Sequence, residues 1–217
     1  MRHYKGIIFD LDGTLLNTIE DLSDSVNHVL TAFNHPEHSY DEYKLKIGKG
    51  FRNLIEVSFP EDCRDNSTID SALSMFLETY DKKYMDKTHP YDGIIPMLEK
   101  IQENGILIGV NSNKRTDYTN ALVKKHFPNT QFVEIFGERT GIPKKPDPCS
   151  ALEIAELMGL SPEEILYVGD SKTDILTGQN AGMDTVGVLW GFRDQFELTQ
   201  FRATYIVKHP KQIVQLI

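Results

Sequence analysis

The stretch GIIFDLDGTL, residues 6–15, decides the fold class of this chain. Its first four residues are apolar, as expected of a strand that is buried on both faces of a parallel sheet. Asp10 and Asp12 follow at the carboxyl end of that strand, which is where open α/β sheets bind their ligands. Residues two apart on an extended backbone point the same way, so both carboxylates can face one reacting group. A D-x-D before glycine is also compatible with a solvated turn, and the rest of the chain has to decide between the two.

Further short apolar runs predict more strands of the same sheet. They lie at residues 106–110, 132–136, 165–168 and 185–189, and amphipathic stretches separate the later ones. This alternation predicts an α/β fold with a Rossmann-like parallel sheet flanked by helices on both faces.

The alternation is interrupted once, between the first strand and the run that begins at residue 106. Within this gap, residues 19–33, 43–59 and 69–85 carry apolar residues at helical spacing. We therefore predict an all-helical inserted domain at residues 16–85, and a core formed by residues 1–15 and 86–217.

The composition argues against several classes of protein. The 217 residues include 23 Lys and Arg against 32 Asp and Glu, and the net charge of −9 opposes nucleic acid or an anionic membrane as the main partner. Cys63 and Cys149 lie far apart and are expected to be reduced thiols. No apolar run is long enough to span a bilayer. Within residues 1–10 a charged residue follows too soon for the apolar segment of a secretory signal. We expect a cytoplasmic protein.

Polar side chains also lie where three later segments reach the same edge of the sheet. Ser112 and Asn113 follow the second strand and can donate hydrogen bonds to phosphoryl oxygens. Lys145 precedes a predicted helix and can neutralise a carboxylate and a phosphate. Asp170 and Asp174 follow the fourth strand at a spacing that places them on one helix face. Each group alone is compatible with a solvated turn or a helix start, but together they predict a site for phosphoryl transfer.

These segments, in this order, resemble the motifs of the haloacid dehalogenase superfamily of phosphotransferases. The resemblance rests on residues 10–15 (DLDGTL), Ser112, Lys145 before proline, and residues 169–174 (GDSKTD). The helical insertion is placed as in members with a C1 cap, and phosphoglycolate phosphatases are the most similar group. Asn17 departs from the pattern, since the family often has aspartate there.

The resemblance implies a Mg²⁺-dependent phosphatase that forms an aspartyl-phosphate on Asp10, with Asp12 as acid and base. The ligands of Mg²⁺ would be Asp10, the backbone carbonyl of Asp12, and Asp170. Asp174 would orient water around the metal. The expected partner is a small phosphorylated metabolite, with 2-phosphoglycolate as one candidate, and the protein is expected to be a monomer or a homodimer.

Other residues are expected to hold the substrate. Ser112 and Asn113 would bind the phosphoryl oxygens, and Lys145 would hold Asp10 against the phosphate. In this family the cap selects the leaving group. Lys49 and Arg52, in a cap segment similar to one of phosphoglycolate phosphatases, are candidates for binding a substrate carboxylate, and a solvated helix start is an equal alternative.

Other functions stay open at this stage. A sugar-phosphate mutase shares Asp10, Asp12 and the cap, although Gly169 stands where those mutases commonly carry glutamate. A haloalkanoate dehalogenase needs no magnesium and lacks the acid at the position of Asp12. A pyrophosphatase or nucleotidase of the same family would differ in substrate alone. A non-catalytic metal-binding module would leave the filled catalytic positions unexplained.

Overall fold

The computed structural model describes residues 4–217, and the chain divides into two compact units. The first unit consists of the N-terminal segment that ends at Leu16 together with Pro90–Ile217, and the second is Asn17–His89. The division falls within two short strands that pair with each other, β2 (Leu16–Asn17) and β3 (His89–Pro90). The predicted core starts at residue 1, so its first three residues lie outside the described part. That the second unit acts as a cap stays a prediction.

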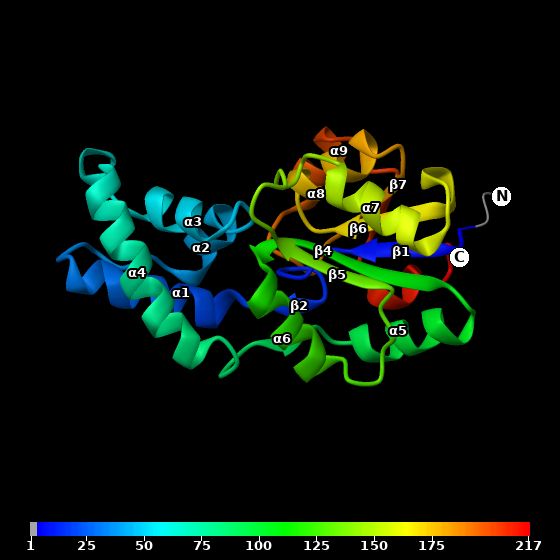
Figure 1. The fold of residues 1–217 in the computed structure, drawn as a ribbon, viewed down its shortest axis with the longest axis horizontal. Coiled ribbons are helices and arrows are strands. Elements are labelled where there is room, and N and C mark those ends of the chain that lie inside the picture. Colours follow the sequence, from blue (N-terminus) through cyan, green and yellow to red (C-terminus); the bar gives the residue numbers. More distant parts are fainter. Residues whose placement is uncertain (1–3) are drawn as a thin grey trace. The chain divides into compact units, whose positions relative to one another are not determined.

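The first unit is built on a six-stranded sheet (Figure 1). In spatial order its strands are β5 (Glu134–Glu138), β4 (Leu107–Arg115), β1 (Gly6–Phe9), β6 (Ile165–Gly169), β7 (Asp184–Val188) and β8 (Tyr205–Val207). All neighbouring strands pair in parallel, which confirms the predicted sheet. The sequence did not predict β8, because an apolar run of three residues is too short to separate from a loop.

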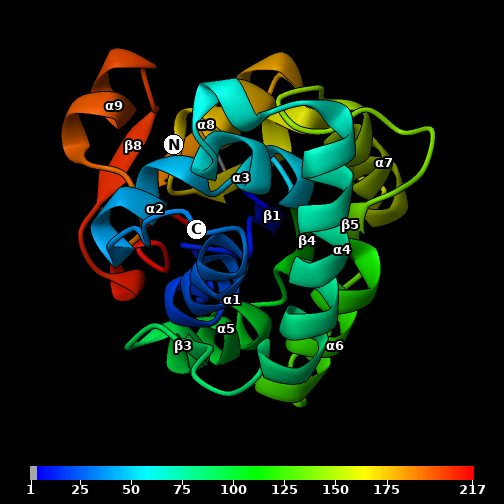
Figure 2. The same cartoon turned by 90° about the vertical axis from the view of Figure 1, so that its left-hand side faces the viewer.

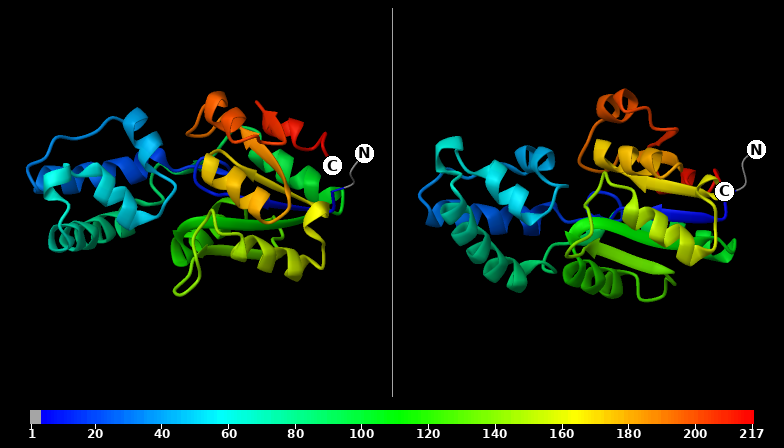
Figure 3. Two further views of the ribbon diagram at one scale, coloured as in Figure 1. Left: turned by 90° about the horizontal axis from the view of Figure 1, so that it is seen from above. Right: turned by 45° about the horizontal axis from the view of Figure 1, so that its top comes forward.

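Helices cover both faces of this sheet (Figures 1 and 3). On one face lie α5 (Ile94–Glu103) and α6 (Thr116–His126), and on the other lie α7 (Cys149–Met158) and α8 (Lys172–Asn180). The chain between β7 and β8 forms α9 (Gln195–Gln200), and 3₁₀ turns occur at Pro162–Glu164 and Pro210–Gln212. Ile7, Ile8 and Phe9 in the central strand have no solvent exposure, as expected of a strand covered on both faces.

The second unit consists mainly of helices. They are α1 (Ile19–Ala32), α2 (Tyr40–Lys46), α3 (Phe51–Ser58), a 3₁₀ turn at Glu61–Cys63, and α4 (Asn66–Lys83). α1 packs against α4 (Figure 2), and α3 also packs against α4. The stretch at residues 43–59, which carries apolar residues at helical spacing, is divided between α2 and α3. The chain breaks between α2 and α3, where Gly48 and Gly50 adopt positive φ angles of 120° and 88°.

Strand β4 is longer than predicted. The sequence placed its end at residue 110, but it continues to Arg115 with a shift of register against β5 between Asn111 and Arg115. Gly137 of β5 permits this close approach, because a Cβ at that position would lie 2.4 Å from the carbonyl oxygen of Lys114. As a result, Ser112 and Asn113 lie within the strand rather than in a loop after it.

None of the helices formed by residues 4–217 combines the length and the apolar character needed to cross a membrane.

Candidate active site

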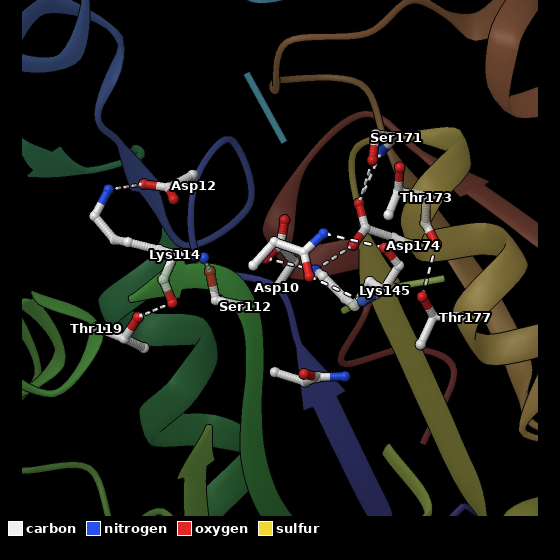
Figure 4. Close-up of polar contacts among 12 residues, drawn as sticks. Asp10, Asp12, Ser112, Lys114, Thr119, Lys145, Ser171, Thr173, Asp174 and Thr177 are labelled. Atoms are coloured by element: carbon white, nitrogen blue, oxygen red, sulfur yellow. Dashed lines mark hydrogen bonds and ion pairs between the residues drawn. The ribbon is translucent and has the colours of Figure 1, made fainter. Parts of the chain in front are cut away.

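Buried carboxylates and a buried lysine meet at the carboxyl end of the sheet (Figure 4). The Nζ atom of Lys145 lies 2.8 Å from Oδ1 of Asp10 and 2.7 Å from Oδ1 of Asp174. Asp10, Asp170 and Asp174 each offer a carboxylate oxygen, and these three atoms lie within 4.8 Å of one another. The side chains predicted from separate segments of the sequence are therefore close together.

Burial and mutual repulsion oppose the ionisation of these carboxylates. Burial raises the pKa of Asp10 well above its usual value, and Asp174 adds to the rise while Lys145 opposes it. Burial likewise raises the pKa of Asp170 to about 7, and repulsion by Asp174 contributes. Burial alone would lower the pKa of Lys145, but Asp10 and Asp174 raise it well above its usual value. A cation that prefers oxygen ligands would relieve the repulsion, so the cluster fits Mg²⁺.

The local sequence of α8 holds Asp174 in the cluster. Its Oδ2 accepts hydrogen bonds from the backbone N–H of Ser171, at 3.1 Å, and from the hydroxyl of Ser171, at 2.6 Å. This is a capping box at the start of a helix, and it leaves Oδ1 to bind Lys145. Gly169 is required beside it, because a Cβ there would lie 2.2 Å from the Cβ of Asp174.

Asp12 turns away from Lys145 and towards Lys114 (Figure 4). The Nζ atom of Lys114 lies 2.9 Å from Oδ1 of Asp12, and the Lys114 side chain is only 1% exposed. The backbone N–H of Lys114 donates to the hydroxyl oxygen of Ser112 at 3.2 Å. Sequence reasoning assigned no role to Lys114. The sequence feature that could have indicated a role for Lys114 is its position directly after Ser112 and Asn113, on the strand that pairs with β1.

Asn113 makes a contact that was not predicted. Its Nδ2 donates to the carbonyl oxygen of Lys145 at 3.2 Å, and its Oδ1 accepts from the backbone N–H of Lys145 at 2.9 Å. Both ends of the amide therefore hold the segment that carries Lys145. A contact of Asn113 with phosphoryl oxygens stays a prediction.

Lys49 and Arg52 belong to the second unit. Arg52, in the first turn of α3, forms an ion pair with Asp70 and donates to Oδ1 of Asn66 at 3.3 Å. Lys49 is exposed in the segment between α2 and α3. The contact predicted between these cations and a substrate carboxylate stays a prediction.

Comparison with known proteins points to one family. Residues 7–188 match the family model described as haloacid dehalogenase-like hydrolase. A phosphoglycolate phosphatase of Psychrobacter arcticus is 31% identical over 204 residues, covering 91% of this chain and 89% of the relative. A phosphoglycolate phosphatase of Mesorhizobium japonicum is 33% identical over 205 residues, covering 94% of this chain and 90% of the relative.

Solved structures share the fold over nearly the whole chain. A crystal structure from Lactobacillus delbrueckii subsp. bulgaricus superposes with a TM-score of 0.93 at 29% identity, covering 99% of this chain and 98% of the other. A predicted phosphoglycolate phosphatase from Haemophilus somnus superposes with a TM-score of 0.89 at 26% identity, covering 98% of this chain and 97% of the other.

Proposed function

The chain belongs to the haloacid dehalogenase-like hydrolase family and is a phosphatase, and we propose that its substrate is a small phosphomonoester such as 2-phosphoglycolate. One observation supports the chemistry above all. Asp10 is flanked by Lys145 at 2.8 Å, while Asp12, two residues on, is held by Lys114 at 2.9 Å. Two carboxylates with different lysine partners are thus present at one strand end, and we assign Asp10 as the nucleophile and Asp12 as the acid and base. The names of the two relatives support the choice of substrate.

The carboxylates fit a bound Mg²⁺ ion. Asp10, Asp170 and the backbone carbonyl of Asp12 would hold it, and Asp174 would lie beside these ligands. The fit rests on three buried carboxylates whose oxygens lie within 4.8 Å of one another. When bound, the ion would neutralise negative charge on the nucleophile and on the phosphoryl group.

In the proposed first step, a carboxylate oxygen of Asp10 attacks phosphorus and forms the aspartyl-phosphate. The bond between phosphorus and the ester oxygen breaks, and Asp12 gives its proton to that oxygen as the alcohol leaves. The Lys145 ammonium fixes the attacking carboxylate, and the hydroxyl of Ser112 donates to a phosphoryl oxygen.

In the second step, Asp12 removes a proton from a water molecule that attacks phosphorus. The bond between phosphorus and Asp10 breaks, so the carboxylate is restored and inorganic phosphate is released. The Asp12 carboxyl group therefore serves in both steps. It first protonates the leaving alcohol as an acid and then removes a proton from water as a base.

The sugar-phosphate mutase alternative loses support. The glutamate expected there in a mutase would replace Gly169, and a Cβ at this position would overlap the side chain of Asp174. The cytoplasmic location and the monomeric or homodimeric state stay predictions from the sequence.

A leaving-group comparison tests the role of Asp12. We expect Asp12→Asn to lower kcat/KM for 2-phosphoglycolate by about 10² to 10⁴-fold, since a poor leaving alcohol needs the acid. The loss for p-nitrophenyl phosphate should be much smaller, because its leaving group departs without a proton. Equal losses for the two esters, or none, would contradict the assignment.

A substrate panel tests the proposed ester. It should contain 2-phosphoglycolate, sugar phosphates, nucleoside monophosphates and pyrophosphate, each assayed with Mg²⁺ and with chelator. We expect 2-phosphoglycolate to have the highest kcat/KM and activity to need Mg²⁺. A strong preference for pyrophosphate or nucleotides would overturn the substrate proposal and leave the mechanism intact.

A further inference from the structure

The loop between β7 and α9 contacts both segments that carry the acidic residues of the site. The indole N–H of Trp190 donates to the carbonyl oxygen of Thr14 at 2.9 Å. Two residues on, the backbone N–H of Phe192 donates to Oδ2 of Asp170 at 2.6 Å. One short loop therefore binds the turn after Asp12 and the carboxylate at the end of β6.

The packing between this loop, the turn and Asp170 leaves no room for a methyl group. A Cβ added at Gly191 would lie 2.3 Å from the Cβ of Asp170 and 2.3 Å from the carbonyl oxygen of Gly13. A Cβ added at Gly13, whose φ is +85°, would lie 2.3 Å from Oδ2 of Asp170. The glycines of the loop and of the turn therefore pack directly against the Asp170 side chain, and Gly191 also packs against the carbonyl oxygen of Gly13.

We propose that Trp190 is a positioning residue for the divalent cation site. Its hydrogen bond to Thr14 holds the turn that carries the backbone carbonyl of Asp12, while the Phe192 N–H fixes the rotation of the Asp170 carboxylate. Groups that orient a metal ligand in this way contribute about 10 to 100-fold to metal affinity. This inference rests on the proposed function in one respect, namely that the carboxylate cluster binds Mg²⁺.

The position of Trp190 makes it a reporter of the same site, since the chain contains a single tryptophan. Titration of the metal-free protein with Mg²⁺ should change the tryptophan emission in a saturable way. The midpoint should agree with the dissociation constant from an independent method.

Two replacements test the indole N–H. Trp190→Phe keeps an aromatic ring without the donor, and β-(3-benzothienyl)alanine, incorporated at this one tryptophan position, keeps the bicyclic shape with sulfur in place of N–H. For both proteins we expect the dissociation constant of Mn²⁺, measured by the electron paramagnetic resonance signal of the free ion, to rise about 10-fold or more. The urea midpoint of the metal-free protein should change little in the benzothienyl protein, so a change in affinity there reports positioning and not folding.

Phe196→Ala is the matched control, because Phe196 is an aromatic residue of the adjoining helix with 75% exposure. Its Mn²⁺ affinity should equal that of the unmodified protein. Unchanged Mn²⁺ affinity in the folded benzothienyl protein would overturn the role of Trp190. If the unmodified protein itself bound no Mn²⁺, the metal part of the proposed function would fail instead, so the two failures are distinguishable.

Discussion

Both units bury carboxylates, but they surround them differently. In the second unit Asp21 is 2% exposed, and its two oxygens accept from the backbone N–H of Lys87 at 3.0 and 3.1 Å and from that of Thr88 at 2.8 Å. In the first unit Asp10, Asp170 and Asp174 crowd within 4.8 Å of one another, and Lys145 binds two of them. Backbone donors satisfy both oxygens of Asp21, which has no carboxylate of this cluster beside it, whereas the other three carboxylates lie close enough to repel one another.

The difference in neighbours separates Asp21 from the three aspartates that we propose to act in catalysis or in binding Mg²⁺. Asp21 fixes the start of α1 to the segment after α4, and its hydrogen bonds offset the cost of burying its charge. The crowded cluster also receives donors, from the Ser171 and Phe192 N–H groups and from Lys145, but its carboxylates repel one another. The pKa of Asp170 rises to about 7, first through burial and then through Asp174. Burial of an aspartate is therefore not diagnostic by itself. The kind of neighbour decides what it does.

The largest expected effect comes from Asp10→Asn. Loss of the proposed nucleophile should lower kcat by at least about 10³-fold. The same change removes one of three repelling carboxylates, so the metal-free protein should become more stable to urea. Steady-state kinetics measures the loss of turnover, and urea unfolding in the presence of chelator measures the gain in stability. Near-normal turnover, or a clear loss of stability, would place Asp10 in the structural class with Asp21.

The second effect is stabilisation by Mg²⁺. At a Mg²⁺ concentration of 100 times its dissociation constant, the free energy of unfolding should rise by about 2.7 kcal/mol. Thermal unfolding with Mg²⁺ and with chelator measures this gain. Asp170→Asn should abolish it and Asp21→Asn should preserve it, and the reverse pattern would break the distinction between the two regions.

The pH dependence of that gain follows from Asp170. Its pKa is about 7 in the folded protein against an ordinary value of 3.8, so the folded state keeps a proton that the unfolded state loses. The metal-free protein should lose stability as pH rises from about 4 to about 7, whereas Mg²⁺ binds the ionised carboxylate. We therefore expect a larger gain from Mg²⁺ at pH 8 than at pH 6. A gain that is the same at both pH values would contradict this assignment.

The third effect is the loss of stability in Asp21→Asn. An amide offers only one oxygen to the backbone donors of Lys87 and Thr88 and turns its own N–H groups towards them. We expect the free energy of unfolding to fall by about 2 kcal/mol. Urea unfolding measures it, with Asp24→Asn on the same helix as the control because Asp24 pairs with exposed Lys87 at the surface. Equal losses in the two variants would show that burial of Asp21 adds nothing.

The smallest effect is expected at a half-buried carboxylate, Glu164, which lies 2.6 Å from Nζ of Lys5. The hydrogen bond from Lys5, followed by those from Ser161, lowers the pKa of Glu164 from 4.5 to about 2. The folded value lies below the unfolded one, so its contribution is present above about pH 4.5 and is lost as pH falls towards 2. Glu164→Gln should therefore lower the thermal midpoint slightly at pH 6 and leave it unchanged near pH 2. A difference that grew on acidification would reverse the assigned sign.

Much of the fold could be predicted because each signal is local. A buried strand followed by Asp10 and the alternation of apolar runs with amphipathic stretches are visible within a few residues of the chain. The errors arose where distant segments decide the local conformation. The end of β4 depends on Gly137 of a neighbouring strand, and the pairing of Asn113 with Lys145 depends on two segments 32 residues apart.

By itself, the sequence determined the parallel α/β sheet, the helical insertion and the identity of the charged groups at the strand ends. Apolar periodicity and residue type are properties of the chain alone, and the order of the motifs is too. Only the tertiary structure decided that Asp12 pairs with Lys114, that Asp21 is satisfied by backbone donors, and that Trp190 holds the turn beside Asp170. Hydrogen bonds and charge interactions depend on distances of a few ångströms between segments, and no spacing along a chain specifies them.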